Sequence, residues 1–149
     1  MMKVLFLLVF AFFLTGCGLG NEQASQEPTT GGSEIVDGEM TISLVEESPL
    51  VFHYEVVNQS DKVVTIEFSS SQRIDYSITT KEGKDIYLFS SVATFLQALG
   101  EEELKPDEKL EYVIDLNELD LQEGEYLLSV WLTPMDGPTY KIIKEFTIE

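Results

Sequence analysis

The chain has 149 residues, of which 27 are acidic and 9 basic, so its formal net charge is -18 at pH 7. This charge argues against nucleic acid as a partner, because the chain lacks the basic surface that binds phosphate backbones. With one cysteine and one histidine, the sequence also excludes a disulfide and offers neither a familiar zinc site nor a base-activated nucleophile.

The first element is an apolar run from Val4 to Leu14, preceded by Lys3. It is too short to span a bilayer, which takes about 20 apolar residues, and it has the form of a signal-peptide core. Leu14-Thr15-Gly16-Cys17 resembles the lipobox of bacterial lipoproteins, which implies cleavage before Cys17 and acylation of its thiol with diacylglycerol. We therefore expect residues 1–16 to be a lipoprotein signal peptide. An ordinary secretory signal is the alternative.

Residues 17–38 follow as a segment rich in Gly, Ser, Thr, Gln and Glu, which is typical of a flexible linker. Without residues 1–16, 8 basic and 27 acidic residues remain, a net charge of -19. This charge opposes contact with an anionic bilayer, so we expect the acyl chains on Cys17 to anchor the protein to membrane lipid, on the extracytoplasmic face of the cell membrane. Residues 39–149 have the length of one domain.

Apolar and polar residues alternate through residues 39–149, which predicts a series of short strands. The side chains expected to face the core are Met40, Ile42, Leu44, Phe52, Tyr54, Val56, Val64, Ile66, Phe68, Tyr76, Ile78, Leu110, Tyr112, Ile114, Tyr126, Leu128, Val130, Leu132, Ile142, Phe146 and Ile148. Another strand is expected near residues 86–89, facing inward through either Ile86 and Leu88 or Tyr87 and Phe89. Lys144 would point inward in the last strand, which predicts a bulge, an edge position or a snorkelling side chain there.

Two turns and one helix complete the prediction. Asn58-Gln59-Ser60-Asp61 and Lys81-Glu82-Gly83-Lys84 predict reverse turns between antiparallel neighbours. One short helix is predicted from Ser90 to Leu99, because apolar residues recur there at helical spacing after a serine that can cap. Glu101-Glu102-Glu103 is expected to be a solvated loop. Seven or eight strands with one short helix or helical loop predict an all-β, immunoglobulin-like antiparallel β-sandwich.

Several segments of this domain also carry a resemblance to a known family. They are Val57-Asn58-Gln59-Ser60-Asp61, Val64-Thr65-Ile66-Glu67-Phe68, Ser71-Gln72-Arg73-Ile74-Asp75-Tyr76, Gly83-Lys84-Asp85-Ile86-Tyr87-Leu88-Phe89-Ser90, Phe95-Leu96-Gln97-Ala98, Leu104-Lys105-Pro106-Asp107-Glu108 and Glu123-Gly124-Glu125-Tyr126. In this order and spacing they resemble the BsuPI family, the bacterial intracellular proteinase inhibitors and their relatives. The resemblance implies an immunoglobulin-like sandwich and a protease-inhibitor role. A lipobox would place this member outside the cell, unlike the family's intracellular members.

Three segments are candidates for binding a partner. Tyr87, Phe89 and Phe95 concentrate aromatic groups between two strands, where they form either an interface or a seal at one end of the sandwich. Pro134 and Met135 lie in a hairpin loop whose two prolines would limit the entropy lost on docking, although turn formation explains the loop equally well. Trp131 falls on the outer face of its strand, where it is either a binding anchor or covered by a loop.

These observations favour a protein that is not an enzyme, with no catalytic residue, metal ion or cofactor. We expect a membrane-anchored lipoprotein whose sandwich binds another extracytoplasmic protein, and the family resemblance implies a protease as that partner. A cell-wall or carbohydrate-binding module acting through Trp131 is the alternative, followed by a structural spacer in an envelope complex. His53 is expected to be a solvated residue on the polar face of its strand.

Overall fold

The computed structural model describes residues 29–30, 34–36 and 40–149, so the predicted signal peptide, Cys17 and most of the predicted linker lie outside the described residues. The described strands are β1 (Thr29–Thr30), β2 (Glu34–Val36), β3 (Met40–Ser48), β4 (Val51–Asn58), β5 (Val64–Phe68), β6 (Ile74–Thr80), β7 (Asp85–Leu88), β8 (Gly100–Leu104), β9 (Lys109–Asp115), β10 (Gly124–Leu132) and β11 (Thr139–Ile148), with one 3-10 turn, Phe89–Ser91. Within these ranges, no helix has the length and apolar character needed to cross a bilayer.

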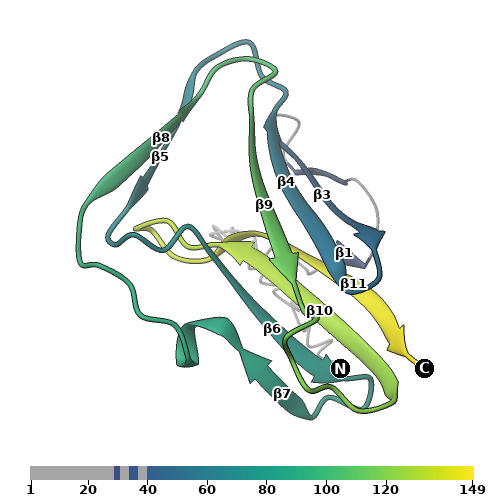
Figure 1. The fold of residues 1–149 in the computed structure, drawn as a ribbon. Coiled ribbons are helices and arrows are strands. Elements are labelled where there is room, and N and C mark those ends of the chain that lie inside the picture. The colour runs from purple at the N-terminus through teal and green to yellow at the C-terminus, as the bar shows by residue number, and fades with distance from the viewer. Residues whose placement is uncertain (1–28, 31–33, 37–39) are drawn as a thin grey trace, which may run out of the picture.

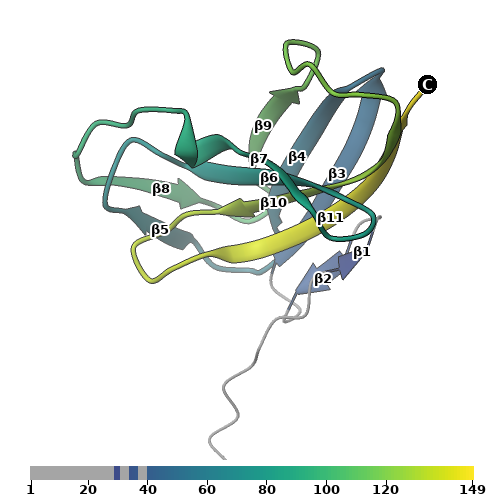
Figure 2. The same ribbon diagram turned by 90° about the horizontal axis from the view of Figure 1, so that it is seen from below.

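The strands form a five-stranded sheet in the order β1-β11-β10-β6-β7, a four-stranded sheet in the order β2-β3-β4-β9, and a two-stranded sheet of β5 and β8. Every pairing is antiparallel except that of β1 with β11. The two larger sheets enclose the core, where Phe52 of β4 meets Phe146 of β11 at a ring-centroid distance of 5.6 Å. The predicted all-β antiparallel sandwich is confirmed (Figures 1 and 2).

The core is built from the side chains that the alternation places inward. Met40, Ile42 and Leu44 of β3 are buried, as are their counterparts along β4 and β10. In β7 the inward residue is Tyr87, whereas Ile86 and Leu88 remain 39% and 40% exposed. The second of the two predicted registers for this strand is therefore the observed one.

The two-stranded sheet is a continuation of β4 and β9 beyond a corner, and it closes one side of the molecule (Figure 1). At this corner Asn58 is fully buried, and its amide nitrogen donates to the carbonyls of Lys62 at 2.7 Å and Leu104 at 2.9 Å. Its amide oxygen accepts from the backbone N–H of Ser60 at 2.9 Å. The predicted hairpin at Asn58–Asp61 is wrong, because β4 pairs with β9 and β5 pairs with β8. The hairpin predicted at residues 81–84 joins β6 to β7 as expected.

The helix predicted from Ser90 to Leu99 does not form, and the segment begins with the 3-10 turn Phe89–Ser91, which matches the alternative of a helical loop. The backbone of Leu96 is bonded to the distant Ser71: Ser71 N–H donates to Leu96 C=O, and Leu96 N–H donates to Ser71 Oγ, both at 2.9 Å. A helix would need the same backbone N–H and C=O groups, so these contacts compete with helix formation. Gly100 begins β8, and the predicted acidic loop Glu101–Glu103 is part of that strand.

The ladder between β10 and β11 has no bulge at Lys144, which is paired with Leu128. The irregularity of this ladder lies instead between Val130 and Leu132. Tyr140 in this part of β11 has a φ of 53°, in the left-handed region that few side chains adopt.

Within the predicted linker, β1 pairs with β11 and β2 pairs with β3, so part of this segment belongs to the sheets.

Candidate protein-binding surface

The loop at residues 133–138, between β10 and β11, is held against the rest of the domain by hydrogen bonds. Thr133 N–H donates to the carbonyl of Arg73 at 3.0 Å, and Met135 N–H donates to the carbonyl of Glu67 at 2.8 Å. Within the loop, Gly137 N–H donates to Pro134 C=O at 3.1 Å and closes a turn. The predicted hairpin loop thus has a defined shape that needs no disulfide.

Arg73 connects this loop to the two-stranded sheet. Its Nε donates to Glu102 Oε1 of β8 at 2.8 Å, and its Nη1 donates to the carbonyl of Ser70 at 2.9 Å. The guanidinium also lies over the ring of Phe68, 4.5 Å from its centroid, which favours a cation–π contact. Because the carbonyl of the same residue accepts from Thr133, Arg73 positions both β8 and the start of the loop.

Met135 is the exposed apolar side chain of the loop, with 51% of its surface accessible. Beside it lies a shallow cleft of about 400 Å³ that is also lined by Phe68 and Leu99. Leu99 is 80% exposed. Loop and sheet therefore present two neighbouring apolar side chains to solvent at this end of the molecule.

The aromatic candidates Tyr87, Phe89 and Phe95 form one cluster of rings with Tyr76. Phe89 stacks on Tyr76 at a centroid distance of 4.9 Å and meets Phe95 edge-on at 5.7 Å. Tyr87 lies 5.8 Å from Tyr76. This packing matches the alternative in which the segment seals one end of the sandwich, and the side chains it exposes are their neighbours Ile86, Leu88, Val92, Leu96 and Leu99.

Trp131 lines a second cleft, of about 480 Å³, together with Ile86, Leu88 and Val92. Trp131, the third binding candidate, therefore lies next to the exposed side chains of β7 and of the residues that follow it. Lys141 Nζ lies 5.1 Å from the centroid of the indole ring and covers one of its faces. A sugar that stacked on that face would have to displace this cation, which disfavours the carbohydrate-binding alternative.

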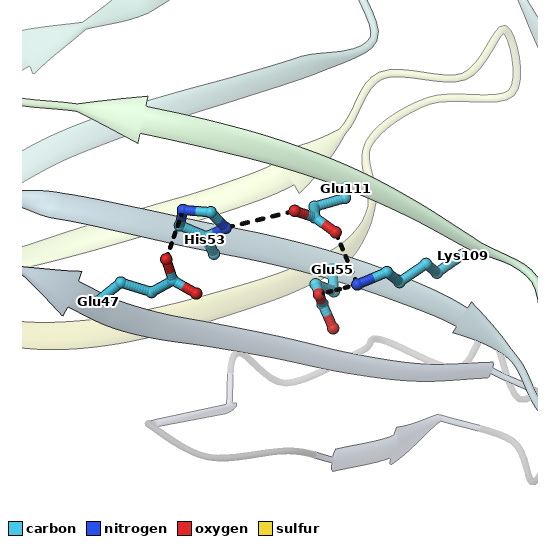
Figure 3. Close-up of polar contacts among 5 residues, drawn as sticks. All are labelled: Glu47, His53, Glu55, Lys109 and Glu111. Atoms are coloured by element: carbon cyan, nitrogen blue, oxygen red, sulfur yellow. Dashed lines mark hydrogen bonds and ion pairs between the residues drawn. The ribbon is translucent and has the colours of Figure 1, made fainter.

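His53 lies on the predicted polar face, but it is not simply solvated. Its Nε2 is 3.1 Å from Glu47 and its Nδ1 is 3.5 Å from Glu111, and the side chain is 21% exposed. Lys109 joins the same network through Glu111 at 2.6 Å and through Glu55, as Figure 3 shows. The hydrogen bond from Lys109 lowers the pKa of Glu111 below its ordinary value.

The two glutamates that contact His53 lie on opposite sides of its ring, so they cannot share one metal ion with it. More generally, the described part of the chain contains no group of three His, Cys, Asp or Glu residues placed to bind a metal ion.

Sequence reasoning missed Arg73 and Glu102 as the residues that position the loop. One signal was present, since Arg73 is the single arginine in a chain with 27 acidic residues. Its partner could not be read from the sequence, because Glu102 lies in a segment that was expected to be a loop and is instead a strand.

Comparison with known proteins gives one family. The family model "BsuPI: Intracellular proteinase inhibitor" matches residues 37–136. No curated protein matches the chain significantly. Among solved structures, the chain is similar to a β-glucosidase from Kluyveromyces marxianus in complex with glucose, with 20% identity and a TM-score of 0.35, over 79% of this chain and 13% of that one. A similarity of this strength supports no statement about function.

Proposed function

We propose, since this chain belongs to the BsuPI family of intracellular proteinase inhibitors, that it binds and inhibits a protease through the 133–138 loop from a lipid-anchored position outside the cell. The observation that carries this proposal is the exposed side chain of Met135 on a loop held at Arg73 and Glu67. An apolar side chain on a preorganised loop can enter a substrate pocket while losing little conformational entropy.

The composition of the loop supports the same role. Pro134 and Pro138 restrict the backbone on both sides of Met135, so the loop samples few conformations when it is unbound. Inhibitory loops need such restriction because a flexible loop would lose more entropy on binding and would be cleaved more readily. Here the backbone hydrogen bonds replace the disulfide that the chain cannot form.

The lipid anchor is supported by the sequence Leu14-Thr15-Gly16-Cys17. The first described strand, β1, begins at Thr29 and pairs with β11 of the domain. Only residues 18–28 therefore separate the proposed acylated cysteine from the folded part, and a fully extended chain of this length reaches about 40 Å. An anchored inhibitor would act only on proteases close to the outer surface of the membrane.

The inhibitor role is tested with the full chain and a panel of purified secreted serine proteases. We expect stoichiometric inhibition of at least one of them, with Met135→Asp weakening inhibition by at least about tenfold because it places a charge in a pocket that accepts an apolar group. Met135→Leu is the matched control and should retain inhibition. Full protease activity at an excess of the unmodified chain would refute the proposal.

The anchor is tested separately, in bacteria that express the full chain and are fed a labelled fatty acid. We expect the label in the chain and its loss in Cys17→Ser. Incorporation that persists in the variant would show that Cys17 is not the acylated residue. This outcome would leave the inhibitor proposal standing.

A further inference from the structure

A third cleft, of about 550 Å³, lies behind the loop and does not include Met135. One wall is β5, residues 64–67, and the other is formed by Pro134 and residues 136–140. The two walls meet where Met135 N–H bonds the carbonyl of Glu67, and away from that point the cleft separates them. The cleft is thus a gap that follows the edge of a strand.

This edge of β5 has unused hydrogen-bonding groups. Among the described residues, β8 is the only strand paired with β5, and the bond from Met135 to Glu67 is the only backbone hydrogen bond to its other edge. In an antiparallel strand, residues two apart direct their backbone groups to the same side. The N–H and C=O of Thr65 therefore point into the cleft, as the carbonyl of Glu67 does.

The opposite wall is kept away from β5 by the irregular start of β11. Tyr140 has a φ of 53°, which bends the strand as it leaves the loop. The hydroxyl of the buried Tyr54 donates to the carbonyl of Tyr140 at 2.6 Å and fixes this bend to the core. The gap is consequently a feature of the fold, since closing it would break a hydrogen bond from a fully buried side chain.

The charges that line the cleft indicate what it accepts. Glu67 and Asp136 line opposite walls, and none of the described residues that line either wall is a lysine or arginine. A second copy of this chain would bring another strongly negative surface, since the net charge is -18. A segment with a basic side chain is complementary to both carboxylates.

We propose that this cleft binds an extended segment of a partner protein that carries a lysine or arginine, and that the segment adds to the free edge of β5 as a further strand. Residues 64–67 offer room for about four residues, or roughly 13 Å of extended chain. Backbone hydrogen bonds to the N–H and C=O of Thr65 supply affinity, and the two carboxylates select the basic side chain. This site is distinct from the exposed tip at Met135.

The test uses the full chain in detergent and a fluorescein-labelled, acetylated pentapeptide amide, Val-Thr-Lys-Val-Thr, with binding measured by fluorescence anisotropy. We expect the lysine peptide to bind at least about tenfold more tightly than the same peptide with glutamate in the central position. Slower hydrogen exchange of the Thr65 amide in the complex would show that this N–H has gained an acceptor. Equal affinities, or no binding of either peptide, would overturn the proposal.

Two variants separate backbone pairing from side-chain contacts. Thr65→Pro removes the N–H that faces the cleft while leaving the pairing with β8 intact, and it should weaken binding by about tenfold. Thr65→Val keeps that N–H and should bind as the unmodified chain does. Unweakened binding by Thr65→Pro would overturn the strand-addition mode.

Charge reversal provides a test that does not depend on how well the proline variant folds. Glu67→Lys should weaken the binding of the lysine peptide and strengthen the binding of the glutamate peptide. An unchanged preference would overturn the assignment of the cleft. Because the side chain of Met135 does not line the cleft, protease inhibition by the loop and peptide binding in the cleft are measured separately, and a failure of either proposal leaves the other standing.

Discussion

Arg73 and Lys109 are both cations that contact glutamates, and they lie in regions of very different character. Arg73 stands at the edge of the two-stranded sheet with 25% of its side chain exposed, bonds Glu102 and lies over the ring of Phe68. Lys109 lies on the open face of the four-stranded sheet with 46% of its side chain exposed, between Glu55 and Glu111. The chemistry of the pairs is alike, but their surroundings are not.

The difference shows that the contribution of an ion pair to the fold depends on which other contacts the same residue makes. Arg73 also bonds the carbonyl of Ser70, and its own carbonyl accepts from Thr133, so it is part of the support of the loop. Lys109 contacts carboxylates on an outer surface, where water competes and salt screens the interaction. We therefore expect changes at Arg73 to affect stability and the loop, and changes at Lys109 to affect only local charge.

Replacing Arg73 should have the largest effect. Arg73→Met keeps most of the apolar stem but removes the bonds to Glu102 and Ser70, and we expect a loss of about 2 kcal/mol in the free energy of unfolding. The amide of Thr133 should exchange faster with solvent. Denaturant unfolding and hydrogen exchange measure the two effects.

Arg73→Lys is the control for charge alone. A lysine keeps the positive charge but cannot present the planar fork that reaches Glu102 and Ser70 together, so it should recover only part of the lost stability. Full recovery would mean that charge, and not geometry, explains the role of Arg73. If the free energy of unfolding were unchanged in Arg73→Met, the inferred difference between Arg73 and Lys109 would be wrong.

The sequence predicts the sheets well because alternation reports which face of a strand is buried. Ile42, Tyr54 and Leu128 all face the core as their positions predict. Alternation does not report which strands are neighbours. The residues from Asn58 to Asp61 have the composition of a hairpin turn, yet the buried amide of Asn58 links the chain to Leu104, 46 residues away.

The candidate site was predictable only in part, for a related reason. The exposed loop with Pro134 and Met135 can be read from turn residues between two strands. The helix expected at residues 90–99 fails because Ser71 satisfies the backbone of Leu96, a contact between distant segments. The cleft beside β5 depends on the bend at Tyr140 and on its tie to Tyr54, and local sequence patterns encode neither.

Gly100→Ala should have an intermediate effect, because an added Cβ would lie 2.6 Å from Nη2 of Arg73. The guanidinium would have to shift, and we expect a loss of about 1 kcal/mol in the free energy of unfolding. In the Arg73→Ala background this contact is gone, so the cost of the glycine substitution should fall. A double-mutant cycle measured by denaturant unfolding tests the coupling. Additive effects would show that Gly100 does not constrain Arg73.

Lys109→Met should have the smallest effect and should be seen mainly in a titration. The hydrogen bond from Lys109 is the main cause of the lowered pKa of Glu111, so this pKa should rise toward its ordinary value, as measured by NMR of the carboxyl carbon. A lowered pKa in the folded state stabilises the protein above the unfolded pKa, and this contribution is lost as the pH falls through the folded value. Any loss of stability in the variant should therefore be largest above the ordinary glutamate pKa, shrink below it, and vanish below the lowered pKa of the folded state.

Salt provides the control for Lys109, because screening weakens exposed ion pairs far more than partly buried ones. Added sodium chloride should reduce the difference between Lys109→Met and the unmodified chain, and it should leave most of the deficit of Arg73→Met in place. If salt removed both deficits equally, Arg73 would act as a surface charge like Lys109. The position of the 133–138 loop would then depend on its backbone hydrogen bonds to Arg73 and Glu67 alone.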